Sequence, residues 1–171
     1  MKSLNIAFIL FLTTIFAFSA CQKEDVTEEE NINVVKMKVG SLSFAWSDTD
    51  GDGGAAPKID TIRLTTSTTS DFSVVFEDGS VSPAKDLTTE IVAESNDHLL
   101  VFTPTGANLT FSSLSKDGNG KDFGQTGKIA VGAASTGSLQ IILLHQPNKS
   151  ATDPSKTGTQ DRVVTFPVVV K

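Results

Sequence analysis

The residues with the clearest potential for chemistry lie in a short acidic, glycine-rich segment that begins at Asp48. It reads Asp-Thr-Asp-Gly-Asp-Gly-Gly, which places carboxylates at Asp48, Asp50 and Asp52 and a glycine, Gly53, at the sixth position. Carboxylates at alternate positions, followed by a glycine that permits a sharp turn, let a loop wrap a hard cation with oxygen ligands. This spacing is that of the first half of an EF-hand loop. We therefore predict a Ca2+ site in this segment.

The second half of an EF-hand loop is missing. The twelfth position, which should carry a bidentate glutamate, is Ile59, and Asp60 comes one position later. The flanking residues have strand patterns, whereas an EF-hand needs helices. The segment instead resembles the free-standing calcium loops that join strands in many secreted domains, with the Gly54 carbonyl and Asp60 as further ligands beside the three aspartates. An acidic β-turn that interacts only with water is the alternative.

The other residues capable of chemistry form no recognisable constellation. His98 and His145 are the only histidines, and the single cysteine lies near the amino terminus, so the usual ligand set of a zinc site is lacking. We expect both histidines to be ordinary residues at strand ends. Glu90 and Glu94 have the i,i+4 spacing of an exposed helix face. The sequence contains no Gly-x-Ser-x-Gly elbow, P-loop or dinucleotide motif. We predict no catalytic residues and no enzyme activity.

Residues 1–20 have the features of a lipoprotein signal peptide. Lys2 supplies a positive start, and a mainly apolar stretch from Ile6 to Phe18 follows. The stretch is shorter than the roughly 20 apolar residues of a membrane-spanning helix and fits a cleaved secretory signal. Ser19, Ala20 and Cys21 resemble the lipobox of bacterial lipoproteins. The resemblance implies cleavage after Ala20 and fatty acyl chains on Cys21, which would anchor the protein to a membrane.

Residues 21–31 are predicted to be the lipidated cysteine and an acidic, flexible tether. From Gln22 to Asn31 there are five acidic side chains and one apolar residue, which is too little apolar surface to offset the entropy of ordering. The run Cys-Gln-Lys-Glu-Asp that starts at Cys21 resembles the lipoprotein export signal of Bacteroidota. That resemblance implies a lipid-anchored protein of the outer membrane that faces the cell exterior.

Residues 32–171 are predicted to form a single β-sandwich domain. Short segments with alternating apolar residues, separated by frequent turn signals, favour an antiparallel sandwich, immunoglobulin-like or related. The expected strands cover 33–39, 42–46, 59–66, 72–76, 98–103, 108–113, 127–131, 138–145 and 162–170. At most one short helix is expected, between Asp86 as its N-cap and Asn96. The net charge of −6 argues against nucleic acid as a partner.

Most of the mature chain resembles a group of small Bacteroidota surface lipoproteins of unknown function. The resemblance rests on Asp48-Thr-Asp-Gly-Asp-Gly-Gly with Pro57 and Ile59-Asp60-Thr61-Ile62, on Thr89-Glu90-Ile91 to His98, on Leu144-His145-Gln146-Pro147, and on Thr165-Phe166-Pro167-Val168. It implies the location and the β character but no activity.

These features favour a cell-surface lipoprotein whose calcium-braced sandwich binds a protein or glycan ligand without catalysis. The first alternative is an accessory subunit of an outer-membrane nutrient-uptake complex. The second alternative is a hydrolase, which would need a deep pocket near His98 or His145.

The calcium prediction is tested by thermal unfolding. Extracellular calcium modules bind with dissociation constants of about 0.1–1 mM, so millimolar Ca2+ should raise the melting temperature. Asp50→Ala should abolish the rise, because it removes a central carboxylate of the loop. If millimolar Ca2+ leaves the melting temperature of the unsubstituted protein unchanged, the calcium site is wrong.

Overall fold

The computed structural model describes residues 30–51 and 53–171. The predicted signal peptide, Cys21, nearly all of the predicted tether and Asp52 lie outside the described residues. No helix within the described part combines the length and the apolar character needed to cross a membrane. The elements are β1 (Val34–Val39), β2 (Leu42–Ser47), β3 (Lys58–Ile59), β4 (Ile62–Leu64), β5 (Thr69–Asp78), β6 (Lys85–Asp86), α1 (Thr88–Ala93), β7 (His98–Thr105), β8 (Leu109–Ser112), β9 (Thr126–Val131), β10 (Ser135–His145), a 3-10 turn η1 (Pro154–Lys156) and β11 (Thr159–Val170).

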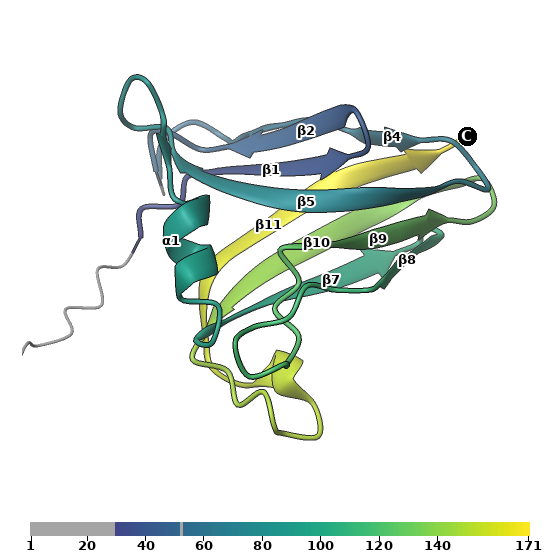
Figure 1. The fold of residues 1–171 in the computed structure, drawn as a ribbon. Coiled ribbons are helices and arrows are strands. Elements are labelled where there is room, and N and C mark those ends of the chain that lie inside the picture. Colours follow the sequence, from purple (N-terminus) through teal and green to yellow (C-terminus); the bar gives the residue numbers. More distant parts are fainter. Residues whose placement is uncertain (1–29, 52) are drawn as a thin grey trace, which may run out of the picture.

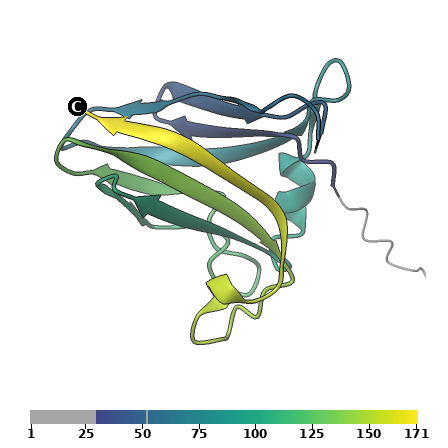
Figure 2. The same cartoon turned by 180° about the vertical axis from the view of Figure 1, so that it is seen from behind.

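The strands form two sheets that face each other, as the predicted β-sandwich requires (Figure 1). One sheet has the order β3-β2-β1-β5-β9-β8, with β6 paired to β5. The other has the order β4-β11-β10-β7, and β10 and β11 cross the front of the molecule when it is seen from behind (Figure 2). Strand pairing is antiparallel except between β4 and β11, which run parallel. The prediction of a mainly β fold with one short helix is confirmed.

The core lies between the two sheets because the inward positions of each strand are apolar. In β10 the inward residues are Leu139, Ile141 and Leu143, and in β11 they begin with Val164 and Phe166; all are at most 2% exposed. The alternation of buried and exposed residues along these strands is the period-2 pattern of a strand with one face on a core. The inward positions of β1 and β5 supply the opposite face.

Helix α1 is shorter than predicted, and its N-cap differs. The N-cap position is Leu87, not Asp86, although the Asp86 carboxylate accepts a hydrogen bond from the Thr88 N–H at 2.7 Å. The helix ends at Ala93 rather than near Asn96, because turn hydrogen bonds such as Asp97 N–H to the Glu94 carbonyl replace the helical pattern. The side chain of Ile91 is fully buried and holds the helix against one end of the sandwich (Figure 1).

An irregularity in β11 determines which side chains reach this end of the core. Leu143 of β10 is opposite Arg162, but the next residue, Leu144, is opposite Gln160. Asp161 is therefore an extra residue in β11, which is the definition of a β-bulge. Bulges redirect side chains away from the strict alternation of a strand. Here the bulge places the side chain of Asp161 beside that of His145, the last residue of β10.

The fold predicts a large effect of Phe166→Ala on stability. Phe166 is fully buried between the sheets, so the truncation should lower the free energy of unfolding by about 3–5 kcal/mol. The matched control is the exposed neighbour Thr165, whose replacement by alanine should change it by no more than about 0.5 kcal/mol. Urea unfolding measures both, and equal small effects would contradict the placement of β11.

Candidate functional site

The two histidines lie side by side, although the sequence gives no sign of it. His98 begins β7, His145 ends β10, and the two residues are opposite each other in the antiparallel pair β7–β10. Their rings are stacked, with centroids 5.1 Å apart and ring planes 24° apart. The expectation of strand-end positions is confirmed, but the two rings form one cluster rather than two unrelated sites.

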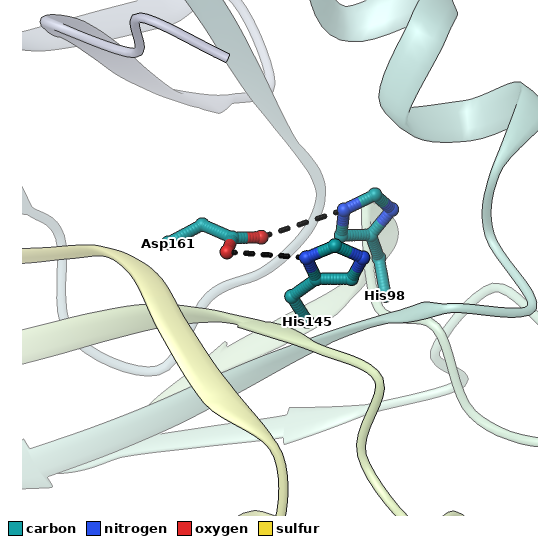
Figure 3. A group of neighbouring side chains, drawn as sticks. All are labelled: His98, His145 and Asp161. Carbon is teal, nitrogen blue, oxygen red and sulfur yellow. Dashed lines mark ion pairs between the residues drawn. The ribbon is translucent and has the colours of Figure 1, made fainter. Parts of the chain in front are cut away.

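Asp161 completes this cluster from the neighbouring strand β11 (Figure 3). Its Oδ2 lies 3.4 Å from Nε2 of His98, and its Oδ1 lies 3.6 Å from Nδ1 of His145. The ligand atoms of the three side chains all lie within 4.8 Å of one another. We call His98, His145 and Asp161 the His–Asp cluster.

The His–Asp cluster lies at the end of the core, largely shielded from water. The side chain of His98 is 2% exposed, that of Asp161 is 20% exposed and that of His145 is 25% exposed. Two further carboxylates approach from outside, Glu30 from the segment that precedes β1 and Glu94 from the residue that follows α1; both have a ligand atom within 4.8 Å of one on His98. Negative charge is thus concentrated around two imidazoles.

The hydrogen bond made by Nδ1 of His98 determines whether the other ring nitrogen, Nε2, carries a proton or a lone pair. Nδ1 of His98 lies 3.1 Å from the Glu94 backbone carbonyl. A carbonyl oxygen only accepts, so Nδ1 carries the proton, and in the neutral ring Nε2 presents a lone pair. Nε2 lies 3.4 Å from the Asp161 Oδ2, a second acceptor, and neither of these buried atoms has a hydrogen-bond partner. Two facing acceptors repel unless a cation, either a proton or a metal ion, stands between them.

The surroundings favour positive charge on His98. Burial by itself lowers the pKa of His98, because desolvation disfavours the charged ring. The carboxylates of Asp161 and Glu30 and the Glu94 carbonyl outweigh it, so that the pKa of His98 lies above its usual value of 6.5. Burial raises the pKa of the Glu30 carboxyl, and the nearby acidic groups add to the rise against the opposing effect of His98.

The same atoms fit a divalent transition metal. Imidazole nitrogen and carboxylate oxygen bind zinc at about 2.0–2.2 Å in a tetrahedral arrangement, which places neighbouring ligand atoms about 3.3–3.6 Å apart. In the His–Asp cluster, one ligand atom from each of the three side chains lies within 4.8 Å of the other two. The distances of 3.4 and 3.6 Å run from the histidines to different oxygens of Asp161, so binding through a single carboxylate oxygen requires small side-chain rotations. The Glu94 carbonyl would act as the outer partner that fixes the ring of a metal-bound histidine.

The structure describes all of the residues predicted to bind calcium except Asp52. Asp48 and Asp50 line one polar cavity, and the carboxylate of Asp50 accepts a hydrogen bond from the Ala55 N–H at 2.8 Å. This hydrogen bond is the main reason why the pKa of Asp50 is lowered. Asp60 instead accepts a hydrogen bond from the Ala45 N–H at 2.9 Å, within the pairing of β2 and β3.

Gly54, another predicted contributor to the calcium site, and a second acidic turn at Asp117 also have defined surroundings. Gly54 donates its N–H to the Gly51 carbonyl in a tight turn, and a Cβ there would lie too close to the Asp50 carboxylate. The carboxylate of Asp117, in a second acidic turn, pairs with Lys149 at 2.8 Å and accepts two backbone N–H groups, so it is already satisfied. Calcium binding at the Asp48 segment stays a prediction.

Sequence reasoning missed the His–Asp cluster because strand pairing, not spacing, brings its members together. The one available signal was that both histidines end predicted strands, which is compatible with neighbouring strand ends. Comparisons of the chain with protein-family models, with curated proteins and with solved structures give no match.

The raised pKa values predict how the stability of the metal-free protein depends on pH. A group whose pKa is raised by folding stabilises the fold below its unfolded pKa and loses that effect as the pH rises through the folded pKa. For His98 this window begins near pH 6.5, and for Glu30 near pH 4.5. The free energy of unfolding, measured in urea with a chelator present, should therefore fall between about pH 6 and 8.

Asp161→Asn supplies the control for this prediction, because it removes the carboxylate that accepts a hydrogen bond from the protonated His98 ring, the largest effect that raises the pKa of His98. Its stability should depend less on pH in the same window. Carboxyls with lowered pKa values, such as those of Asp78 and Asp153, change the stability only near and below pH 3.8. They therefore do not contribute to the pH dependence between about pH 6 and 8. A free energy of unfolding that rises from pH 6 to 8 in the unsubstituted protein would refute the assignment.

Proposed function

We propose that this protein is a lipid-anchored module of the cell envelope that binds a divalent transition metal ion, with zinc the best fit, through His98, His145 and Asp161. The observation that carries the proposal is the pair of buried, unpartnered acceptors, Nε2 of His98 and Oδ2 of Asp161, that face each other at 3.4 Å. The role is binding without catalysis, and the anchor is the predicted acylated Cys21.

A metal ion satisfies the surroundings of the His–Asp cluster better than a proton does. With both rings neutral, the three carboxylates of Asp161, Glu30 and Glu94 leave a local charge of about −3 around His98. A single proton satisfies one nitrogen-to-oxygen contact, whereas a divalent ion contacts both imidazoles and the carboxylate at once and carries twice the charge. The proton remains the competitor, so metal affinity should rise with pH.

The ligand types select the class of metal. Two imidazoles and a carboxylate suit zinc and neighbouring transition metals, whereas calcium and magnesium prefer oxygen ligands only. Three protein ligands leave one tetrahedral position free. Glu30 and Glu94 are the nearest additional carboxylates to fill it, and a water molecule would serve equally.

A zinc site with three protein ligands is also the arrangement of many hydrolases, which is the competing function. A hydrolase needs a cavity that places substrate against the metal. The structure contains a cavity of about 470 Å³ near Phe102 and Phe111 and a second of about 330 Å³ near Asp48. In the part of the chain that the structure describes, neither is lined by a member of the His–Asp cluster, so we favour binding.

Isothermal titration of the purified, chelator-treated protein with Zn2+ tests the proposal. We expect one ion per chain. Asp161→Asn and His145→Gln should each weaken binding by more than about 100-fold, since even residues that only orient a ligand typically contribute 10–100-fold. These two side chains are partly exposed, so their replacement should leave the fold intact, whereas fully buried His98 is a poorer choice.

Asp153→Asn is the matched control, because Asp153 is an exposed aspartate paired with Lys156 and lies outside the cluster. It should bind Zn2+ as the unsubstituted protein does. Equal affinity in the control and in both cluster variants would place any bound ion elsewhere, and no binding at all would refute the proposal.

A further inference from the structure

A polar cavity of about 330 Å³ lies beside the Asp48 segment, separate from the His–Asp cluster. Polar groups dominate its lining, which includes Asn31, Asn33, Asp48, Asp50, Ser80 and Arg162. A water molecule occupies about 30 Å³ in the liquid, so the cavity has the volume of about ten water molecules. That is enough for a small molecule rather than a single ion.

Two half-buried lining residues each carry a charged group with one buried atom that has no partner. Oδ1 of Asp48 and Nε of Arg162 are both shielded from water and neither makes a hydrogen bond. Their charges are opposite, yet no ion pair joins Arg162 to an aspartate among the described residues. Leaving a buried charged group unpaired is costly, of the order of several kcal/mol in the interior of a protein. Opposite charges that line one cavity without pairing can both be satisfied by a bound molecule that carries both charges.

Arg162 and Asp48 each have one contact that locates them beside the cavity. The Arg162 guanidinium lies over the ring of Trp46, 5.5 Å from its centroid, in a cation–π contact. The backbone N–H of Asp48 donates to the Asn33 carbonyl at 2.8 Å, which positions the Asp48 backbone. The two opposite charges thus line one cavity.

The remaining polar side chains are largely satisfied within the fold. Oδ1 of Asn33 accepts the Gly79 N–H at 2.6 Å, and the side-chain amides of Asn31 and Asn33 contact Asp78. Asp50 accepts the Ala55 N–H, and its lowered pKa keeps it ionised at neutral pH. The groups that still lack a partner are thus the negatively charged Asp48 and the positively charged Arg162.

We propose that this cavity binds a small zwitterion, such as an α-amino acid, with its carboxylate on Arg162 and its ammonium group on Asp48 and Asp50. A guanidinium binds a carboxylate through two parallel hydrogen bonds, and a carboxylate accepts from an ammonium group. A lone metal cation leaves Arg162 unpaired, so an amino acid would compete with the predicted calcium ion for Asp48 and Asp50. A neutral sugar leaves both charges uncompensated. The proposal is independent of zinc binding.

Thermal unfolding of the full-length protein in detergent tests it, with each of the common L-α-amino acids added singly at about 10 mM. At a tenfold excess over its dissociation constant, a ligand should raise the melting temperature by about 3–6 °C. Ethylamine, acetate and glucose are the probes with one charge or none, and they should give no comparable rise. Asp48→Asn and Arg162→Lys should each remove the amino-acid shift.

Arg63→Lys and Asp71→Asn are matched controls on exposed residues outside the cavity, and they should keep the shift. The proposal is overturned if no amino acid shifts the melting temperature, if acetate or glucose shifts it equally, or if the shift survives in both cavity variants. Zn2+ titration of the same cavity variants separates the two proposals. If these variants bind zinc normally but the unsubstituted protein shows no amino-acid shift, the cavity proposal fails and the metal proposal is unaffected. If the unsubstituted protein shows the amino-acid shift but binds no zinc, the metal proposal fails and the cavity proposal is unaffected.

Discussion

Two acceptor atoms inside one end of the sandwich, Nε2 of His98 and Oδ2 of Asp161, face each other at 3.4 Å without a hydrogen bond. The Glu94 carbonyl fixes the proton of the ring on the other nitrogen, so this contact is repulsive unless a cation occupies it. The charge at this end of the molecule, the preference of His98 for the protonated form and the fit to a transition metal all follow from that single constraint. Protons and metal ions compete for the same atoms, which makes the site sensitive to both.

The fold creates this constraint through strand order and one inserted residue. Strands β7, β10 and β11 are consecutive in their sheet, so His98, His145 and Asp161 come from three neighbouring strands at the same end. Without the bulge, alternation would turn the side chain of Asp161 away from the core, because Val164 and Phe166 face inward. The bulge instead directs Asp161 to the histidines, while the next residue, Arg162, packs over Trp46 and lines the polar cavity. The neighbouring residues Asp161 and Arg162 of this bulge thus contribute one side chain to each of the two proposed sites.

Local patterns predicted most of the fold, because alternation and turn residues are encoded within a few positions. Most strands from Val34 onward agree with the predicted segments to within a few residues. The exceptions are the predicted strand 59–66, which is divided into β3 and β4 in different sheets, and β6, which was not predicted. The predicted position of the end of α1 was less accurate, because the residues after Ala93 form turn hydrogen bonds in place of a further helical turn. The His–Asp cluster escaped prediction because pairing between β7 and β10 joins residues that are distant in the sequence, and a bulge has no reliable sequence signature. The Asp48 motif predicted an acidic loop, but not that the Asp60 carboxylate would accept the Ala45 N–H.

X-ray absorption at the zinc edge tests the central claim most directly, because it reports which atoms surround the bound ion. The account predicts nitrogen and oxygen ligands at about 2.0–2.2 Å, together with the outer-shell scattering of two imidazole rings, those of His98 and His145. A spectrum with oxygen ligands alone and no imidazole scattering would contradict it. Such a spectrum would place the ion on carboxylates elsewhere in the chain, and the two facing acceptors would then require protonation of His98 alone.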